Sequence, residues 1–473
     1  MRVQTFKAGP DYIDPLFHDK VFSDSSYSTL GLHNSHGARE TAEKSFSRPA
    51  LRRCENLDPF FSDPDTLVDI FVKASAEAEI SVIEGVMGLY DGIGTKDGKG
   101  STYALASGLK VPIVLIVDAK GASRSLLALI KGFLDYDEDS LIKGVILNRC
   151  GMRLHDSLAP VIEEELGIRV FGYLPENKDI EIQSRYLGLV TPDELVDINQ
   201  KLGRLGALIA ETMDLDGLAG LTGLDGLTMS CSIPYDALAD RKVDLPKAED
   251  NTAGVTGESG AGIKLGVAYD EAFCFYYREN LRQLRRAGFD IVWFSPLNDP
   301  QLPDGISGIY LGGGYPELWA EKLEENRTIM VDITQKIGAG MPVIAECGGY
   351  MYLTRSIGSE GYGMCGVFGS ECSGHDKTVR FGYVKVSDRS GYWLAPGQTI
   401  LGHEFHYYDS SDNGDGAEVT KASTGVSYRA GHVTENIWAG WPHLYFRSAP
   451  AFTEAFYSKC DAYMQAERRK NEQ

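Results

Sequence analysis

The sequence predicts an α/β protein built from two doubly wound domains, one in each half of the chain. Uninterrupted apolar runs at 80–85, 111–118 and 143–148 end in Gly, Asp or Asn, which is typical of buried parallel strands. Helical patterns at 64–79 and 122–134 precede or separate these runs. Because alternating strands and helices build parallel sheets, we expect polar residues at the strand ends to lie where such folds bind ligands.

The composition changes between residues 236 and 262, where the chain is rich in charge, Gly, Ser and Thr and has no aromatic side chain. This stretch predicts a linker between an N-terminal domain at 1–235 and a C-terminal domain at 263–473. A second alternation follows the linker. Its expected strands are 264–270, 289–294, 306–311 and 341–345, and its expected helices are 277–287 and 318–338.

The charge and the cysteine content exclude several classes of partner and site. The formal net charge of −21 disfavours nucleic acid and anionic membrane as partners. Eight scattered cysteines without a C-x-x-C pair indicate neither a disulfide framework nor a zinc site, and they suit a reducing compartment. No apolar run approaches the roughly 18 residues of a membrane span. We therefore expect a cytoplasmic protein.

The segment PVIAECGGY at 342–350 carries the strongest chemical signal. A strand is expected to deliver Cys347 to a sharp turn, with Gly348 and Gly349 opening the next helix, as in a nucleophile elbow. A helix N-terminus at this place would lower the pKa of the thiol, and neighbouring backbone N–H groups would stabilise an oxyanion. A small buried structural cysteine is the alternative. The surrounding glycines favour the nucleophile.

A glycine loop and several histidines are candidates to complete this site. Gly312, Gly313 and Gly314 follow an apolar strand, where backbone N–H groups can face a ligand. A nucleophilic cysteine also needs a base. Spacing alone does not choose among four histidines of the last third that have polar neighbours: His403, His406, His432 and His443. The first two, with Glu404, also allow a weaker interpretation as metal ligands.

The segments YLGGGYPE, AECGGYMYL, GHEFHY and WPHLYF resemble the amidotransferase half of the cobyrinic acid a,c-diamide synthase family. The resemblance implies a class I glutamine amidotransferase-like domain with His443 as base. It assigns glycines 312–314, with Gly348, to the oxyanion hole and the glutamine site. Tyr445 stands where ordinary class I enzymes have glutamate, so the third member of a triad stays open. Leu401 stands where the family usually has arginine, so a contact can be missing.

A second group of polar residues lies in the N-terminal half. FKAGPDYIDP places Lys7, Asp11 and Asp14 after a short expected strand at 3–6. VIEGVMGLYDG ends another strand in Glu84 and continues to Asp91 in a Gly-rich loop. Carboxylates at the C-terminal ends of such strands are good magnesium ligands opposite a nucleotide triphosphate. Solvated carboxylates that cap helices are the alternative for either group alone.

Both groups resemble the same synthase family, as do five further segments: 58–61, 100–106, 117–121, 144–149 and 172–175. The resemblance implies an ATP-dependent amide-synthetase domain with a P-loop-NTPase-like, dethiobiotin-synthetase-like parallel sheet. It implies that Asp11, Asp14 and Glu84 handle Mg²⁺ and ATP. It also assigns Lys7 to nucleotide or substrate binding, and Asp91 to catalysis near the substrate carboxylate.

Two features depart from that family. No G-x-x-x-x-G-K-S/T motif occurs in the sequence, whereas family members begin with a P-loop before the FKAGPD segment. This predicts either a truncated sequence or a lost phosphate cradle, and no tight binding of ATP by these residues. The Ser/His/Arg-rich stretch at 23–55 is also longer than expected.

The sequence thus predicts ATP- and glutamine-dependent amidation of the a and c acetates of cobyrinic acid in cobalamin biosynthesis, through an acyl phosphate and ammonia released at Cys347. Hydrogenobyrinic acid and nickel sirohydrochlorin remain alternative substrates. A non-ligating, glutaminase-like relic is an alternative of another class. The expected cofactors are ATP and Mg²⁺, the expected small-molecule partners are glutamine and a tetrapyrrole, and a homodimer is possible.

Overall fold

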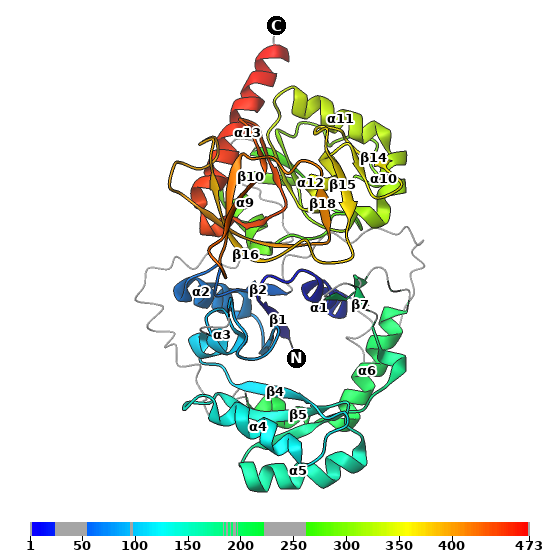
Figure 1. Ribbon diagram of the computed structural model, residues 1–473, viewed down its shortest axis with the longest axis vertical. Helices are drawn as coiled ribbons and strands as arrows, with labels where there is room; N and C mark the ends of the chain where they lie inside the picture. Colours follow the sequence, from blue (N-terminus) through cyan, green and yellow to red (C-terminus); the bar gives the residue numbers. More distant parts are fainter. Residues whose placement is uncertain are drawn as a thin grey trace.

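The computed structural model describes residues 2–23, 54–94, 98–182, 184–185, 188–189, 191–192, 195, 197–221 and 262–471. The described parts of the two halves form two bodies that are stacked along the longest axis of the molecule (Figure 1). Within these ranges, no helix is both apolar enough and long enough to span a membrane. The stretch at 23–55 and the expected linker fall largely outside the described residues.

The first strands form a three-stranded parallel sheet with β1 (Val3–Ala8) between β2 (Glu55–Leu57) and β3 (Ile80–Glu84). The helix α1 (Ile13–Ser23) follows β1, and α2 (Pro64–Ser75) and α3 (Thr102–Leu109) share a core with the sheet. That core is apolar: Phe6, Ala8, Leu57, Leu67, Ile70, Leu105 and Leu109. The strands at 3–6 and 80–83 should be close neighbours if their polar ends converge on Mg²⁺, and the structure shows them as direct neighbours.

A second parallel sheet contains β4 (Ile113–Asp118), β5 (Ile142–Asn148) and β6 (Arg169–Leu174). Its helices are α4 (Ser125–Asp135), α5 (Met152–Leu166), α6 (Ile198–Thr212) and α7 (Leu215–Gly220). The predicted parallel α/β class is confirmed. The described strands of this half nevertheless form two sheets, because β3 and β4 each pair on one side only. Val82 on β3 is 45% exposed, and Ile116 on β4 is 65% exposed.

The C-terminal half is organised around a six-stranded sheet. Five of its strands run parallel to one another, and the edge strand β21 runs antiparallel to them. Buried apolar clusters on this half surround the sheet. The strands, in spatial order, are β10 (Phe289–Phe294), β9 (Ile263–Ala268), β11 (Gly308–Leu311), β12 (Val343–Glu346), β22 (Ile437–Gly440) and β21 (His432–Val433). The helices α9 (Arg278–Arg286) and α13 (Pro450–Asn471) belong to the same half.

The single helix expected at 318–338 is broken. The structure has a 3₁₀ turn at Pro316–Trp319, then α10 (Ala320–Glu325) and α11 (Arg327–Gly338). Asn326 at the break has φ −85° and ψ 58°, outside the helical region. Its side-chain amide donates to the carbonyl oxygens of Pro296 at 2.8 Å and Asp299 at 2.9 Å. These tertiary hydrogen bonds hold the break.

A five-stranded antiparallel sheet lies against the first body and was not expected from the sequence, apart from the strand-like run at its end. Its strands, in spatial order, are β20 (Ser427–Ala430), β19 (Ala417–Lys421), β16 (Arg380–Asp388), β17 (Ile400–His406) and β23 (His443–Tyr445). Tyr383 on β16 donates its hydroxyl to Asp58 of the N-terminal half at 2.9 Å. This sheet therefore contributes directly to the contact between the halves.

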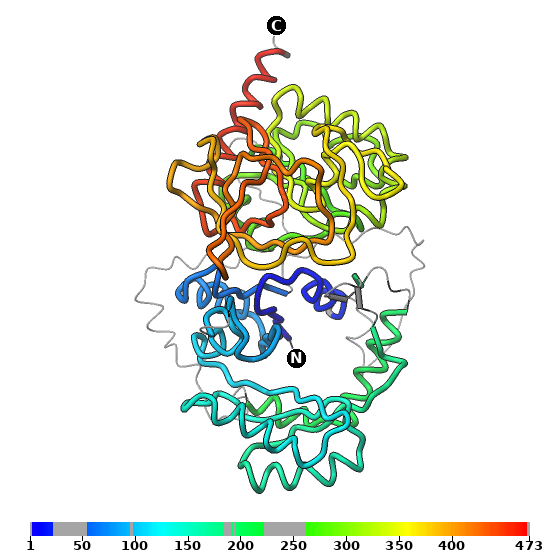
Figure 2. Tube along the Cα trace, in the orientation of Figure 1, coloured from blue at the N-terminus to red at the C-terminus, as the bar shows by residue number. Residues whose placement is uncertain are grey.

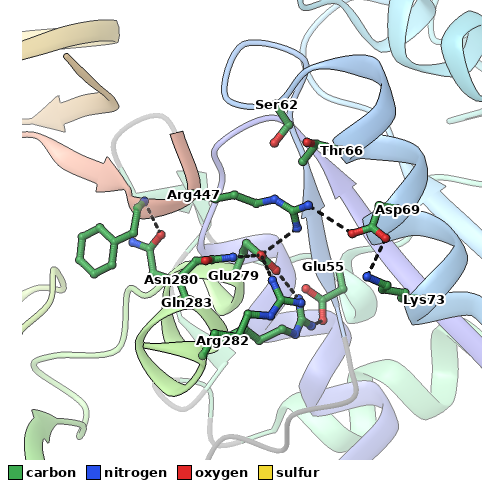
Figure 3. A network of polar contacts seen from close by, with 12 residues as sticks. Glu55, Ser62, Thr66, Asp69, Lys73, Glu279, Asn280, Arg282, Gln283 and Arg447 are labelled. Atoms are coloured by element: carbon green, nitrogen blue, oxygen red, sulfur yellow. Dashed lines mark hydrogen bonds and ion pairs between the residues drawn. The ribbon is translucent and has the colours of Figure 1, made fainter. Parts of the chain in front are cut away.

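The tube view shows the C-terminal half lying directly above the first residues of the N-terminal half (Figure 2). Two kinds of contact join the halves. The first is a polar network, in which Arg282 pairs with Glu55 and Glu279 while Arg447 pairs with Asp69 and Glu279 (Figure 3). The second is a cluster of aromatic side chains: Tyr12, Phe60, Phe61, Tyr277, Tyr383 and Tyr445. The interface is thus both charged and aromatic.

Candidate active site

Cys347 lies on a sharp turn between β12 and α12 (Gly348–Leu353), which confirms the predicted strand–turn–helix arrangement. Its backbone has φ 49° and ψ −107°, a conformation that non-glycine residues rarely adopt and that costs about 1–3 kcal/mol. The turn is held by a hydrogen bond from the N–H of Cys347 to the carbonyl oxygen of Gly440 at 2.8 Å. The thiol is thereby fixed at the C-terminal end of the central strand.

The two glycines after Cys347 allow α12 to pack onto the glycine loop. A Cβ at Gly348 would lie 3.0 Å from the nitrogen of Gly314, and one at Gly349 would lie 2.3 Å from the carbonyl oxygen of Leu311. Larger residues would therefore push the helix away from the loop. The nucleophile turn and the loop at 312–314 are brought together by these close approaches.

The members of the glycine loop have different surroundings. Gly314 has φ 154°, and a Cβ there would lie 2.0 Å from the carbonyl oxygen of Ala272. The N–H of Gly312 donates to the hydroxyl of Tyr276 at 2.8 Å. The N–H of Gly312 is thus engaged with a side chain in this structure, and its expected role at the oxyanion stays a prediction. The backbone nitrogen of Gly314 faces Gly348, whose own N–H is directed at the thiol of Cys347.

His443 on β23 faces this loop. A Cβ at Gly313 would lie 2.2 Å from Cε1 of His443, so only glycine fits beneath the ring. The next residue, Leu444, donates its N–H to Oε1 of Glu346 at 3.0 Å, and this ties β23 to the strand that carries Cys347. Burial, with a smaller effect of His403 and His406, lowers the pKa of His443 to about 3. The imidazole is consequently neutral at physiological pH.

The other candidate histidines are placed elsewhere. His403 pairs directly with His443 across the β17–β23 ladder, but its ring packs against Phe381 and Tyr383. His406, three residues further along the strand and so on its opposite face, stacks on Trp441 at 4.1 Å. No group of three or more potential metal ligands occurs in the described ranges. The arrangement therefore gives the metal interpretation of His403 and His406 no support.

His432 belongs to a separate contact. It lies on β21, stacks on Phe368 at 4.2 Å and accepts or shares a hydrogen bond with the hydroxyl of Tyr350 at 3.3 Å. These contacts indicate that His432 has a packing role next to Tyr350 of α12. Of the four histidines, His443 is the one that the structure places against the glycine loop.

The expectation of a lowered pKa for Cys347 is wrong, although the N–H at the start of α12 acts in the expected direction. Burial raises the pKa of this thiol well above its usual range, and the carboxylates of Glu317, Glu346 and Glu404 add to that effect. The hydrogen bond from the N–H of Gly348 works in the opposite direction but is outweighed. The helix α12 has only 6 residues, so its N-terminus stabilises a thiolate too weakly to offset the loss of hydration on burial.

Glu346 is a residue of the site that sequence reasoning missed. Its Oε2 lies 2.9 Å from the hydroxyl of Tyr310, and its Oε1 accepts from Leu444. Burial raises the pKa of Glu346 to about 8. The available signal was a lone acidic residue at the end of the apolar strand PVIAE, directly before the nucleophile.

The N-terminal group forms around the ammonium of Lys7. Lys7 at the end of β1 lies 2.5 Å from Oδ2 of Asp14 and 3.3 Å from Oε1 of Glu84. Lys7 and Glu84 are register partners on neighbouring parallel strands. His18 of α1 lies 2.6 Å from the other oxygen of Glu84. Three of the predicted residues are therefore brought to one sheet edge.

Asp11 and Asp91 have more local contacts. Oδ1 of Asp11 accepts from the N–H groups of Ile13 at 2.7 Å and Asp14 at 3.2 Å, so it caps α1. Burial and the nearby charge of Asp14 raise the pKa of Asp11. Asp91 is exposed in the loop after β3 and accepts from the N–H of Gly88 at 3.0 Å. The Asp11–Asp14 repulsion is the kind that a bound cation relieves.

A cysteine on a strand–turn–helix elbow, a glycine loop that packs against the elbow and a neutral histidine against that loop define a glutamine amidotransferase domain. Residues 264–451 match the family described as CobB/CobQ-like glutamine amidotransferase domain. A solved structure of PurLQS from Thermotoga maritima aligns with 44% of this chain and 100% of its own, at 15% identity and a TM-score of 0.31.

The similarity to curated relatives extends over nearly the whole chain. Cobyrinate a,c-diamide synthase from Caldanaerobacter subterraneus subsp. tengcongensis is 35% identical over 468 residues, covering 98% of this chain and 92% of the relative. The protein of the same name from Picrophilus torridus is 35% identical over 464 residues, covering 97% and 92%. The chain belongs to the cobyrinate a,c-diamide synthase family. It is a glutamine-dependent, amide-forming ligase of cobalamin biosynthesis.

Proposed function

We propose that the protein converts the a and c acetate side chains of cobyrinate into amides, with glutamine as nitrogen donor and ATP as activating co-substrate. Residues 1–235 would form the ATP-dependent synthetase domain and residues 263–473 the glutaminase domain. The observation that carries this proposal is the meeting of two sites at one interface. Tyr12, beside Asp11, packs its ring 4.9 Å from the ring of His443.

In the proposed glutaminase reaction, Sγ of Cys347 attacks the amide carbon of glutamine and its proton passes to His443. The N–H groups of Gly314 and Gly348 stabilise the oxyanion of the tetrahedral intermediate. His443 then returns the proton to the leaving nitrogen, and ammonia departs. A water molecule, deprotonated by His443, hydrolyses the thioester to glutamate and restores the thiol.

In the proposed synthetase reaction, a substrate carboxylate oxygen attacks the γ-phosphorus of ATP, which forms an acyl phosphate and releases ADP. Ammonia from the glutaminase attacks the acyl carbon, and phosphate leaves with formation of the amide. In this reaction Lys7 would neutralise phosphoryl oxygens, and Asp91 would act near the substrate carboxylate.

The carboxylates around Lys7 fit Mg²⁺ in their chemistry. Asp14 and Glu84 offer oxygen ligands at one sheet edge beside Lys7. Burial and then the nearby charge of Asp14 raise the pKa of Asp11, although the three carboxylates do not form one ligand group in the described ranges. Mg²⁺ is usually held by one or two protein carboxylates together with substrate phosphates, so a complete protein cage is not required. When bound, the ion would neutralise the charge that develops on the phosphates.

A cavity between the halves supports a large carboxylate substrate. It has a volume of about 510 Å³ and lies between the start of α2, α3 and the β16–β17 pair. Its lining is mainly apolar, with Phe60, Ile93 and Leu401 among its members. The charged residues that line it are lysines, Lys99 and Lys385, in a chain with a net charge of −21. An apolar macrocycle with peripheral carboxylates suits such a lining.

The experiment compares cobyrinate, hydrogenobyrinate and nickel sirohydrochlorin as acceptors, with glutamine and Mg-ATP, by liquid chromatography and mass spectrometry. We expect a diamide from cobyrinate. Lys385→Ala should raise the KM for the tetrapyrrole several-fold and leave the KM for glutamine unchanged, whereas Lys336→Ala on the distant helix α11 should change neither. Amidation of another acceptor alone would overturn the substrate assignment, and an unchanged tetrapyrrole KM would overturn the cavity.

A further inference from the structure

We propose that Tyr12 of the N-terminal half is a positioning residue of the glutaminase. Its ring holds the imidazole of His443 in the orientation needed for proton transfer, and it links that orientation to the loop at 9–14 that serves the acceptor site. This inference rests on the proposed function of His443. It assigns part of the glutaminase site to the other half of the molecule.

Tyr12 reaches into an aromatic wall formed by the C-terminal half. Its ring centroid lies 4.9 Å from that of His443, 4.5 Å from that of Tyr277 and 5.4 Å from that of Phe275. The ring of Phe275 is stacked on it, with an interplanar angle of 8°. These contacts seat Tyr12 firmly beside the imidazole, since aromatic pairs at such distances attract each other.

His443 has few polar restraints of its own. Its Nδ1 is buried, with no hydrogen-bond partner among the described residues. The position two residues later, where a carboxylate would be expected to orient the ring, is Tyr445, whose ring stacks on Phe61 at 4.8 Å. Because no carboxylate is seen to fix Nδ1, the ring must be oriented by packing. Gly313 supplies one contact surface, and Tyr12 supplies another.

The segment that carries Tyr12 is tied to the acceptor side. The side-chain amide of Asn56 donates to the carbonyl oxygens of Gly9 at 3.0 Å and Asp11 at 2.8 Å. The hydroxyl of Tyr277 donates to the carbonyl oxygen of Pro10 at 3.4 Å. A shift of this loop on binding of phosphate groups would therefore move the Tyr12 ring against His443. Glutamine hydrolysis is thereby linked to the state of the acceptor site.

The test measures glutamine hydrolysis and ammonia-dependent amidation with Tyr12→Ala and Tyr12→Phe in the full chain. We expect Tyr12→Ala to lower kcat for glutamine hydrolysis by about tenfold, the scale of one aromatic contact, with the KM for glutamine unchanged. Tyr12→Phe should retain most of the activity, because it keeps the ring. Ammonia-dependent amidation should persist in both variants. Tyr392→Ala, in an exposed loop, is the control.

Three outcomes would overturn the inference. An unchanged kcat in Tyr12→Ala would show that the ring does not position His443. An equal loss in Tyr12→Phe would assign the effect to the hydroxyl. A parallel loss of the glutamine- and ammonia-dependent reactions would reduce Tyr12 to a part of the acceptor loop. Failure of the proposed function itself is distinguishable, because His443→Asn would then leave glutamine hydrolysis intact.

Discussion

At the scale of single residues, Cys347 combines a strained backbone with a deeply buried thiol. Burial favours the neutral thiol, and burial also favours the neutral imidazole of His443, whose pKa falls to about 3. The resting pair is therefore uncharged. In the proposed reaction, the nucleophile would be generated when glutamine binds and the proton moves to His443, rather than being present as a thiolate beforehand.

An uncharged resting thiol predicts that alkylation of Cys347 is slow at neutral pH and becomes faster only at alkaline pH. We expect iodoacetamide to modify Cys347 slowly at neutral pH, with a rate that still increases well above the pKa of a free thiol, because a raised pKa moves thiolate formation upward. Mass spectrometry of the peptide that contains Cys347 measures the rate, and Cys347→Ala provides the blank. A rate that reaches a plateau below about pH 8 would mean a thiolate and would contradict the account.

A second prediction at this scale concerns the histidines. His443→Asn should lower the rate of glutamine hydrolysis by at least about 100-fold, because it removes the general base. His403→Asn and His406→Asn should have smaller effects, since their rings pack against Tyr383 and Trp441 instead of the glycine loop. Glutamate release by the three variants decides between them. If His406→Asn is the most impaired, the base has been misassigned.

At the scale of elements, the sequence predicted those helices, strands and turns that depend on neighbouring residues in the chain. The elbow at Cys347 followed from an apolar strand and two glycines, and the pairing of β1 with β3 followed from two apolar strands with polar ends. The register that sets Lys7 beside Glu84 depends on that pairing. These features need only neighbours in the chain or the general rules of parallel sheets.

Elements that depend on distant contacts were not predictable in this way. The break at Asn326 exists because its side chain bonds to a loop some thirty residues earlier in the chain. The hydrogen bond from the N–H of Gly312 was not foreseen because its acceptor, Tyr276, comes from another segment. The β16–β17 pair was missed because its strands complete a sheet only with partners brought in by the fold. Burial of the Cys347 thiol is likewise a tertiary property.

The polar network at the interface gives a prediction at the scale of elements (Figure 3). Glu55 on β2 is buried, and Arg282 of α9 pairs with it. Arg282→Met should destabilise the protein by about 3–5 kcal/mol, because a buried charge loses its partner. Urea denaturation followed by tryptophan fluorescence measures the change. The exposed pair of Lys131 and Asp135 provides the control, and Lys131→Met should cost less than about 1 kcal/mol.

A second variant separates charge from packing in this network. Combining Arg282→Met with Glu55→Leu removes both charges and should recover much of the lost stability. Equal destabilisation by Arg282→Met and Lys131→Met would show that the pair with Glu55 contributes little. Persistent instability of the double variant would assign the effect to lost packing of the arginine side chain.

At the scale of the whole molecule, the protein places two kinds of chemistry on opposite sides of one interface. Cys347 and His443 belong to the C-terminal half, and the group around Lys7 belongs to the N-terminal half. Tyr12 crosses between them. In the proposed function, such an arrangement would let ammonia pass from its source to an activated carboxylate within one protein, and the two half-reactions would use separate catalytic residues.

The proposed division of labour between the two halves can be separated with the nucleophile variant Cys347→Ala. Amide formation is followed for Cys347→Ala at millimolar Mg-ATP, with glutamine or with ammonium chloride as nitrogen donor, beside the unsubstituted protein. The account predicts that the variant loses the glutamine-dependent reaction and keeps the ammonia-dependent one. Loss of both reactions in a variant that is still folded, or survival of the glutamine-dependent one, would contradict it.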